Sequence, residues 1–278
     1  MATHHDDGSL GLLEDLRVLT RRRLFGMVAK GVAGLSLLPI LADCATDSSS
    51  GGSDVDGGSG SGSDGGAGGA CSTIPEETAG PYPGDGTNGP NALTTSGIVR
   101  GDIRTSFGAA SGTAAGIPLT VTVSLVDSTT CSPLAGYAVY IWHCDRDGNY
   151  SMYSSAVQSQ NYLRGVQVTD DHGSVTFTSI FPACYSGRWP HIHFEVYASA
   201  AEATGGRNAV ATSQMAMPKA ACDAVYATTG YSQSVNNLSQ TSLASDMVFS
   251  DGTSLQIPTI SGSTSAGYAA ALTVAIAV

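Results

Sequence analysis

The chain has 278 residues, of which 42% are apolar, 13% charged and 7% aromatic, and its formal net charge is −11. This length and apolar content allow one or two domains with a hydrophobic core. Five of the twelve basic residues precede residue 45, so the rest of the chain holds seven basic and eighteen acidic side chains. Because nucleic-acid binding needs a basic surface to neutralise phosphates, we exclude a nucleic acid as partner.

Residues 1–44 are predicted to be a targeting segment. After a run of arginines, the uninterrupted apolar stretch 31–42 has the length of a signal-peptide core and is too short for a permanent membrane span. The stretch Arg22–Phe25 resembles the twin-arginine motif of bacterial signals that export folded proteins. Leu41–Cys44 resembles a lipobox, in which Cys44 would be lipidated. We therefore expect an exported protein of the periplasm or cell surface, with a lipid tether to the membrane through Cys44. A plain secreted protein and an uncleaved anchor are the alternatives.

Residues 45–70 consist almost entirely of Ser, Gly and Asp, which predicts a disordered linker. Residues 71–278 are predicted to form one all-β domain, a sandwich of two packed antiparallel sheets. The turn Thr169–Gly173, flanked by alternating apolar residues, predicts a β-hairpin. Strands are expected at Leu119–Asp127, Tyr137–Trp142, Gly165–Thr169, Ser174–Thr178, His191–Tyr197, Ala209–Met217 and Tyr268–Val278. We expect no amphipathic helix longer than about three turns.

Cysteine usage fits an exported protein. An odd number of cysteines follows Cys44, which predicts two disulfides and one free thiol in an oxidising compartment and leaves the pairing open. No two of them have the C-x-x-C spacing typical of zinc sites. These five residues are Cys71, Cys131, Cys144, Cys184 and Cys222.

The strongest chemical signal lies between Pro182 and His193. His191 and His193 are two residues apart on a predicted strand, so both imidazoles leave the same face of the sheet, an arrangement that suits two ligands of one metal ion. Tyr185 and Arg188 lie just upstream, in a loop bounded by prolines. The alternative interpretation is a histidine pair on a solvated sheet face.

A second stretch, Trp142–Ser151, ends a strand and enters a turn. Asp145 and Asp147 in this turn are faintly similar to a calcium loop, but the other loop ligands are missing, so we expect a simple turn. His143 is expected to be a structural strand residue, and His172 is expected to be exposed in the hairpin turn.

Together these stretches resemble the signature of the intradiol ring-cleavage dioxygenases, the family of the protocatechuate 3,4-dioxygenases and catechol 1,2-dioxygenases. Glu77–Tyr82 is similar to the N-terminal motif of the family, and later segments are similar to its following strands. The match spans most of residues 71–217 in the order of the family. The later segments are Arg164–Gln167, Gly173–Phe177 and Thr212–Met215.

The resemblance implies intradiol cleavage of a small catechol-type aromatic diol by O2, giving a muconate-type dicarboxylate. It implies a mononuclear non-haem Fe(III) with two Tyr and two His ligands. Fe(III) is a hard ion that suits anionic oxygen, and two phenolates with one hydroxide would balance its charge, so that the cluster can be buried. Arg188 would stabilise charge on the substrate, and Gln214 would line the pocket. The implied ligands are Tyr150 and His191 in equatorial positions and Tyr185 and His193 in axial ones, with Tyr185 displaced by substrate.

Two other hypotheses stay open from the sequence. One is a different metal site on His191, His193 and Glu195, which would need His143 or His172 as a further ligand. The other is a non-catalytic exported β-sandwich that binds carbohydrate or protein, because a fold does not fix an activity. The sequence does not separate protocatechuate, catechol, a chlorinated catechol and hydroxyquinol as substrates, and it does not set the oligomeric state.

Overall fold

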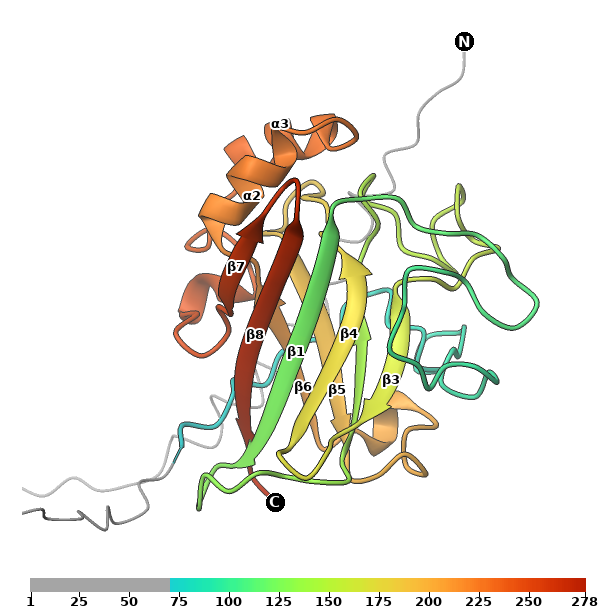
Figure 1. The fold of residues 1–278 in the computed structure, drawn as a ribbon, viewed down its shortest axis with the longest axis vertical. Coiled ribbons are helices and arrows are strands. Elements are labelled where there is room, and N and C mark those ends of the chain that lie inside the picture. The colour runs from blue at the N-terminus through green and yellow to red at the C-terminus, as the bar shows by residue number, and fades with distance from the viewer. Residues whose placement is uncertain (1–70) are drawn as a thin grey trace, which may run out of the picture.

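The computed structural model describes residues 71–278. The predicted targeting segment, the Cys44 lipid site and the linker lie outside the described residues. Two four-stranded sheets face one another, with two short helices at one end of the sandwich (Figure 1). None of the helices in this part of the chain has the length and apolar character needed to span a membrane.

The two sheets have the strand orders β4-β1-β8-β7 and β3-β2-β5-β6, which confirms the predicted sandwich. One pairing departs from the expected antiparallel arrangement, because β1 and β8 run parallel from Leu119–Tyr268 to Asp127–Ile276. A parallel neighbour needs a long connection, which the chain between these two strands provides. The strands are β1 (Pro118–Asp127), β2 (Ala138–Trp142), β3 (Arg164–Val168), β4 (Ser174–Ile180), β5 (His191–Tyr197), β6 (Ala211–Ala216), β7 (Thr259–Ser263) and β8 (Gly267–Ile276).

The core between the sheets follows from the alternation of side chains along each strand. In β5, Ile192, Phe194 and Val196 enter the core and are almost fully buried. In β1, the same role falls to every second residue, among them Val121 and Val123. Fully burying one such side chain contributes roughly 1.5–3 kcal/mol. The other residues of β5 therefore point to the outer face of the second sheet, where loops cover them.

The predicted hairpin at residues 169–173 is wrong. The turn itself forms, since the backbone N–H of Gly173 donates to the carbonyl of Asp170. However, β3 pairs with β2 and β4 pairs with β1, so the turn carries the chain from one sheet to the other. The change of sheet is stabilised by Phe177, which pairs with Val121 in the core. Gly173 has a φ of +73°, and a Cβ there would collide with the carbonyl of Leu125.

The segment between β6 and β7 contains helices that the strand pattern did not reveal. Helices α2 (Lys219–Tyr226) and α3 (Ser232–Ser239) have eight residues each, and α2 buries Val225 and Tyr226 in the core. Strand β7 was also missed, because its sequence Thr-Ile-Ser-Gly-Ser is mostly polar and lies at a sheet edge. Two 3₁₀ helices complete the fold, η1 (Gly206–Asn208) and η2 (Phe249–Asp251).

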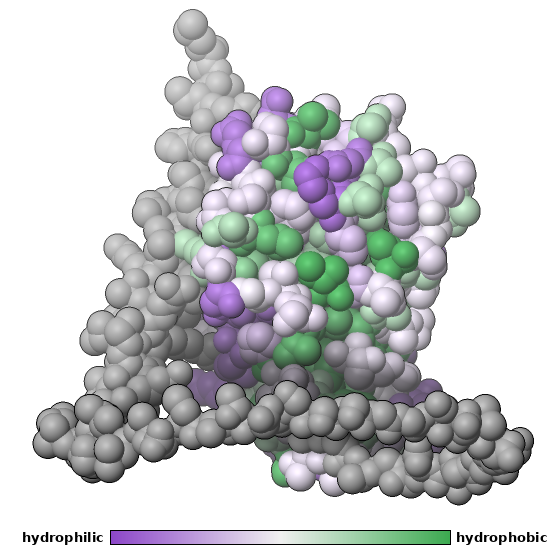
Figure 2. Space-filling model, turned by 90° about the vertical axis from the view of Figure 1, so that its left-hand side faces the viewer, coloured by the Kyte–Doolittle hydropathy of each residue, from purple (hydrophilic) through white to green (hydrophobic). Residues whose placement is uncertain are grey.

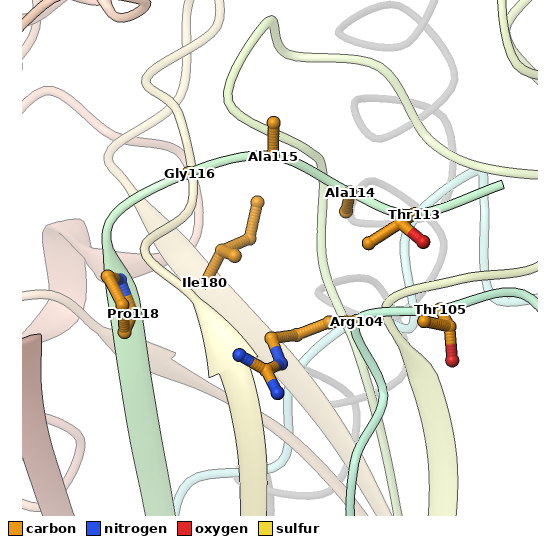
Figure 3. Close-up of a pocket in the computed structure, with 8 residues that line it drawn as sticks. All are labelled: Arg104, Thr105, Thr113, Ala114, Ala115, Gly116, Pro118 and Ile180. Atoms are coloured by element: carbon orange, nitrogen blue, oxygen red, sulfur yellow. The ribbon is translucent and has the colours of Figure 1, made fainter.

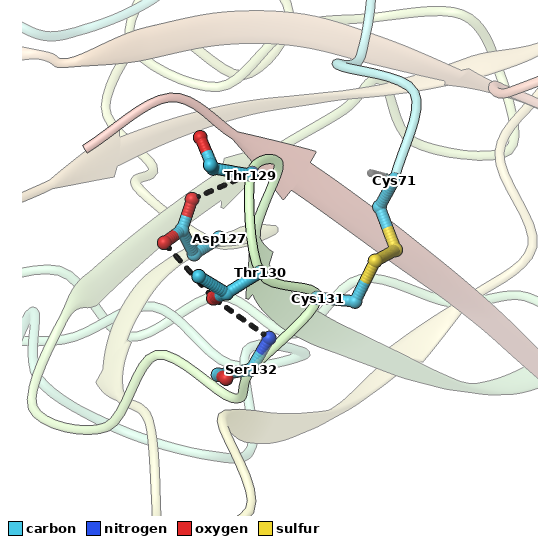
Figure 4. Close-up of a disulfide and its surroundings, with 6 residues drawn as sticks. All are labelled: Cys71, Asp127, Thr129, Thr130, Cys131 and Ser132. Carbon is cyan, nitrogen blue, oxygen red and sulfur yellow. Dashed lines mark hydrogen bonds between the residues drawn. A yellow bond between two sulfur atoms is a disulfide. The ribbon is translucent and has the colours of Figure 1, made fainter. Parts of the chain in front are cut away.

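One disulfide joins Cys71 to Cys131, in the turn that follows β1 (Figure 4). The Asp127 carboxylate stabilises this turn by accepting hydrogen bonds from the Thr129 backbone N–H (2.8 Å) and the Thr130 hydroxyl (3.0 Å). The prediction of two disulfides is wrong for the described residues, because the remaining three thiols are buried separately, as small apolar side chains are. These free cysteines are Cys144, Cys184 and Cys222.

Candidate metal centre

Strand β5 places two imidazoles on the outer face of the second sheet. His191 and His193 point away from the core that Ile192 and Phe194 enter. The His193 ring stacks on Trp142 of β2, with ring centroids 4.9 Å apart and planes inclined by 4°. Each histidine is only 2% exposed, so the interpretation as a solvated histidine pair is wrong.

Two loops bring tyrosines to the same place. Tyr150 follows β2, and Tyr185 lies in the loop before β5. The first loop is shaped by Asp145, whose Oδ1 accepts hydrogen bonds from the backbone N–H groups of Asp147 (3.0 Å) and Asn149 (2.9 Å). The simple turn predicted here is therefore confirmed, and it directs Tyr150 back toward β5.

The four side chains converge on a single point. His191 Nε2 lies 3.4 Å from the Tyr150 hydroxyl and 3.3 Å from the Tyr185 hydroxyl. It also lies 3.0 Å from His193 Nε2. Tyr150 and both histidines are buried, whereas Tyr185 is half-buried and forms the side nearest solvent. The structure thus gathers two imidazole nitrogens and two phenol oxygens in one place.

Burial keeps His191, His193 and Tyr150 neutral in the protein alone. Burial, with the charge of Arg188, lowers the pKa of His191 to about 3. Burial, with the neighbouring His191, lowers the pKa of His193 well below its usual range. Burial, with Tyr185, raises the pKa of Tyr150 well above its usual value. The Trp189 carbonyl lies 2.5 Å from His191 Nδ1, which therefore carries the proton and leaves a lone pair on Nε2.

This donor set fits a hard, highly charged cation. The His191 lone pair faces His193 Nε2, and His193 Nδ1 is buried without a hydrogen-bond partner among the described residues. A bound cation attracts both lone pairs and favours the phenolate form of a tyrosine, and phenolate oxygen suits Fe(III) better than a softer ion. Within residues 71–278, no group of three His, Cys, Asp or Glu side chains is placed to hold a metal, so the centre depends on the phenols.

Arg188 lies fully buried beside this centre. Its Nη2 donates to Gln214 Oε1 at 2.7 Å, and its Nε donates to Asp246 Oδ2 at 3.0 Å. Gln214 is also fully buried, and its Nε2 donates to the Thr78 carbonyl at 2.8 Å. Gln214 therefore holds the guanidinium group, and its expected place in a substrate pocket stays a prediction.

Comparisons with known proteins agree with this arrangement. A family model described as Dioxygenase matches residues 89–209, the part of the chain that contains both tyrosines, both histidines and Arg188. The structure of an intradiol ring-cleavage dioxygenase from Tetranychus urticae is similar with a TM-score of 0.59 and 29% identity, over 74% of this chain and 95% of that chain. The described part of the chain is thus similar, in sequence and in fold, to intradiol ring-cleavage dioxygenases.

The comparisons found two further similar proteins. A chlorocatechol 1,2-dioxygenase from Rhodococcus opacus is 42% identical over 60 residues, 22% of this chain, and the match spans about a quarter (23%) of that relative. The dioxygenase domain of a dioxygenase carbohydrate-binding protein fusion from Streptomyces sp. SirexAA-E is 22% identical, with a TM-score of 0.45, over 74% of this chain and 99% of that chain.

The alternative metal site is not assembled among the described residues. Glu195 lies on the same face of β5, but its Oε2 accepts a hydrogen bond of 2.6 Å from the Tyr197 hydroxyl, and burial raises its pKa to about 8. His143 is buried as a structural residue, with its ring nitrogens against the Cys144 carbonyl and the Ser179 hydroxyl. His172 is exposed in the turn between the sheets, as expected.

Sequence reasoning missed two residues that support this centre. Trp142 was assigned only to a strand, although its ring covers His193. Asp246 lies 58 residues after Arg188, in a segment of serines and apolar residues outside the family-model match. A carboxylate in such a segment gives no sequence signal, because its partner is set by tertiary packing.

A separate hollow of about 470 Å³ opens at the end of β4, lined by Arg104, Ile180 and the segment 113–118 (Figure 3). The Arg104 guanidinium group is already paired with Asp102 at 2.7 Å. On the face of the molecule in Figure 2, hydrophobic side chains lie scattered among hydrophilic ones outside the grey atoms.

Proposed function

We propose that the protein cleaves a catechol-type aromatic diol with dioxygen, between the two hydroxylated carbons, at a mononuclear non-haem Fe(III). The proposed product is a muconate-type dicarboxylate that contains both oxygen atoms of O2. The observation that carries the proposal is the convergence of the Tyr150, Tyr185 and His193 donor atoms within 3.0–3.4 Å of His191 Nε2. Similarity to intradiol ring-cleavage dioxygenases supports the reaction class.

The residues that would hold the ion are these two tyrosines and two histidines. Bound Fe(III) supplies Lewis acidity toward the oxygens of the diol and one-electron redox exchange with the diol and dioxygen. Two tyrosinates and two neutral imidazoles would leave one positive charge, which a hydroxide or an ionised diol can balance. Such compensation matters here because an unpaired buried charge costs several kcal/mol.

Tyr185 differs from Tyr150 in a way that assigns it a proton-transfer role. The Tyr150 side chain is buried, whereas Tyr185 is half-buried and approachable from solvent. As a tyrosinate, Tyr185 would accept a proton at Oη from the incoming diol, which then enters as an anion. Tyr150 would stay in place and keep the donor set anchored to the loop after β2.

Arg188 would act on the charge of the substrate. Its positive charge acts on both His191 and Tyr150, so it lies within electrostatic range of the centre. Because Arg188 is fully buried, water does not screen this charge. By analogy with oxyanion donors, stabilising the developing negative charge contributes about 3 kcal/mol to lowering the barrier.

The test is a spectrum of the purified iron-loaded protein, followed by dioxygen uptake with catechol, protocatechuate, chlorocatechol and hydroxyquinol. We expect a red protein, from charge transfer between tyrosinate and iron, and an ultraviolet product band of a muconate with at least one diol. Tyr185→Phe should lower turnover by at least about tenfold, as loss of a ligand or its support does. The matched control is His172→Ala, which changes an exposed residue. A colourless iron-loaded protein would refute the proposal.

We also propose that the protein is exported, because residues 1–44 resemble a twin-arginine signal that ends in a lipobox. Mass spectrometry of the mature N-terminus tests this proposal. A diacylglyceryl-modified Cys44 supports a membrane tether, and an intact residue 1 with an unmodified Cys44 contradicts both cleavage and lipidation.

A further inference from the structure

Arg188 is a fully buried charged side chain beside the centre, and such a charge needs compensation. Its Nε lies 3.0 Å from Asp246 Oδ2, in an ion pair whose two side chains are both 0% exposed. Its Nη2 is held by Gln214 at 2.7 Å. Two different edges of the guanidinium group are thus fixed by two partners, which sets the plane of the group.

The Asp246 carboxylate uses both of its oxygens. Oδ2 also accepts a hydrogen bond of 2.6 Å from the backbone N–H of Trp189, the residue after Arg188. Oδ1 accepts hydrogen bonds from the backbone N–H groups of Val248 (2.8 Å) and Phe249 (3.2 Å), in its own turn. The carboxylate therefore joins the loop before β5 to the segment before β7.

The contacts of Asp246 extend to His191, one of the proposed metal ligands. The same Trp189 whose N–H binds Asp246 offers its carbonyl to His191 Nδ1, which fixes the tautomer of that imidazole. Phe249, whose backbone N–H donates to Asp246, packs against the His191 ring with centroids 6.4 Å apart. Burial opposes the ionisation of Asp246, but the charge of Arg188 and the N–H donors outweigh it and hold the pKa of Asp246 below its ordinary value.

A second carboxyl group, that of Glu77, lies within electrostatic range of Arg188, and its pKa is shifted in the direction opposite to that of Asp246. Burial and the charge of Asp251 raise the pKa of Glu77 to about 7, although Arg188 lowers it. Glu77 Oε1 accepts a hydrogen bond of 3.2 Å from Gln256. The Asp246 carboxylate contacts both the guanidinium group of Arg188 and the backbone N–H of Trp189, so it directly compensates the buried charge of Arg188.

We propose that Asp246 is a positioning residue, which acts on catalysis only through Arg188 by holding the guanidinium group at the orientation in which its charge meets the substrate. The inference rests on the proposed function, since it assigns Arg188 a substrate to stabilise. It assigns a role to a segment that lies outside the residues matched by the family model.

The test is a double-mutant cycle on the full iron-loaded chain, with wild type, Asp246→Asn, Arg188→Ala and the double variant. Catechol is the probe, and kcat and KM come from dioxygen uptake. We expect Asp246→Asn to lower kcat by about 10–100-fold, as loss of a supporting partner does, with a smaller change in KM. In the Arg188→Ala background, the same substitution should change kcat by less than about twofold, because the residue through which it acts is gone.

Equal fold losses in both backgrounds would overturn the inference, because Asp246 would then act by another route. Asp223→Asn is the matched control, since it removes a carboxylate from an exposed ion pair with Lys219 on α2. Asp246→Glu keeps the charge and should retain more turnover than Asp246→Asn. If thermal unfolding shows that Asp246→Asn does not fold, Asp246→Glu replaces it in the cycle under the same criterion.

A second cycle measures anaerobic catechol binding by calorimetry, so that the two proposals can fail separately. Asp246→Asn should weaken binding several-fold when Arg188 is present and leave binding unchanged when it is absent. A wild type that binds catechol and consumes no dioxygen would refute the proposed function, and the binding cycle would still decide the role of Asp246. Weakening of the same size in both backgrounds would refute that role.

Discussion

Removing the disulfide should destabilise the domain through its unfolded state. Cys71 and Cys131 are 60 residues apart in the chain, and a cross-link that closes a loop of this length restricts the unfolded chain by about 4 kcal/mol. The folded segment keeps other contacts, since the backbone N–H of Ile74 donates to the Ala275 carbonyl and that of Glu77 to the Thr212 carbonyl. We therefore expect Cys71→Ser/Cys131→Ser to fold and to lose about 4 kcal/mol of unfolding free energy.

Urea unfolding followed by tryptophan fluorescence measures this loss, because Trp142 and Trp189 are both buried in the folded protein. For a domain of this size, the loss corresponds to a decrease in Tm of about 10 °C. Reducing agent should lower the stability of the wild type to the same level and leave the double variant unchanged. A double variant that loses less than about 1 kcal/mol would refute the loop-closure argument.

Two other perturbations test the polar site and the core. Burial raises the pKa of Glu77 to about 7 from 4.5, so its contribution to stability is fully present below pH 4.5 and is lost as the pH rises through about 7. Glu77→Gln should therefore flatten the pH dependence of the urea midpoint between these values, and parallel profiles would contradict the assignment. Phe194→Ala, at a fully buried position, should cost about 3–5 kcal/mol of unfolding free energy. Val168→Ala, at an exposed position, should change it by less than about 0.5 kcal/mol, and equal losses would contradict the assigned core.

A strand could be predicted from the sequence where the alternation of its apolar residues matches the face that packs into the core. His191–Tyr197 was predicted with its observed bounds, because alternating apolar residues face the core and the intervening positions carry the polar side chains. The same alternation predicted that His191 and His193 share a face. The meeting of Tyr150 and Tyr185 with them came only from the family resemblance, since two loops far apart in the sequence supply them.

Features set by long-range packing were not predictable. The turn at Gly173 has the composition of a hairpin turn, but the partner of β4 is decided by β1, about 50 residues earlier in the chain. The buried thiols were expected to pair because cysteine counts carry no information on where each side chain lies. Asp246 was missed for a related reason, because its hydrogen bonds with Arg188 and Trp189 form only when the segment before β7 docks on the loop before β5.

The parallel ladder between β1 and β8 has a consequence for biosynthesis. It joins positions roughly 150 residues apart, such as Leu119 and Tyr268, and pairing over such a separation slows folding. While the ribosome is still making the chain, β1 has no neighbour on that side until β8 leaves the exit tunnel. During this interval the open edge of β1, with Val121 and Val123 alternating along it, is free to pair with another nascent chain. The time taken to translate the segment between these two strands therefore sets how long this edge stays without its partner.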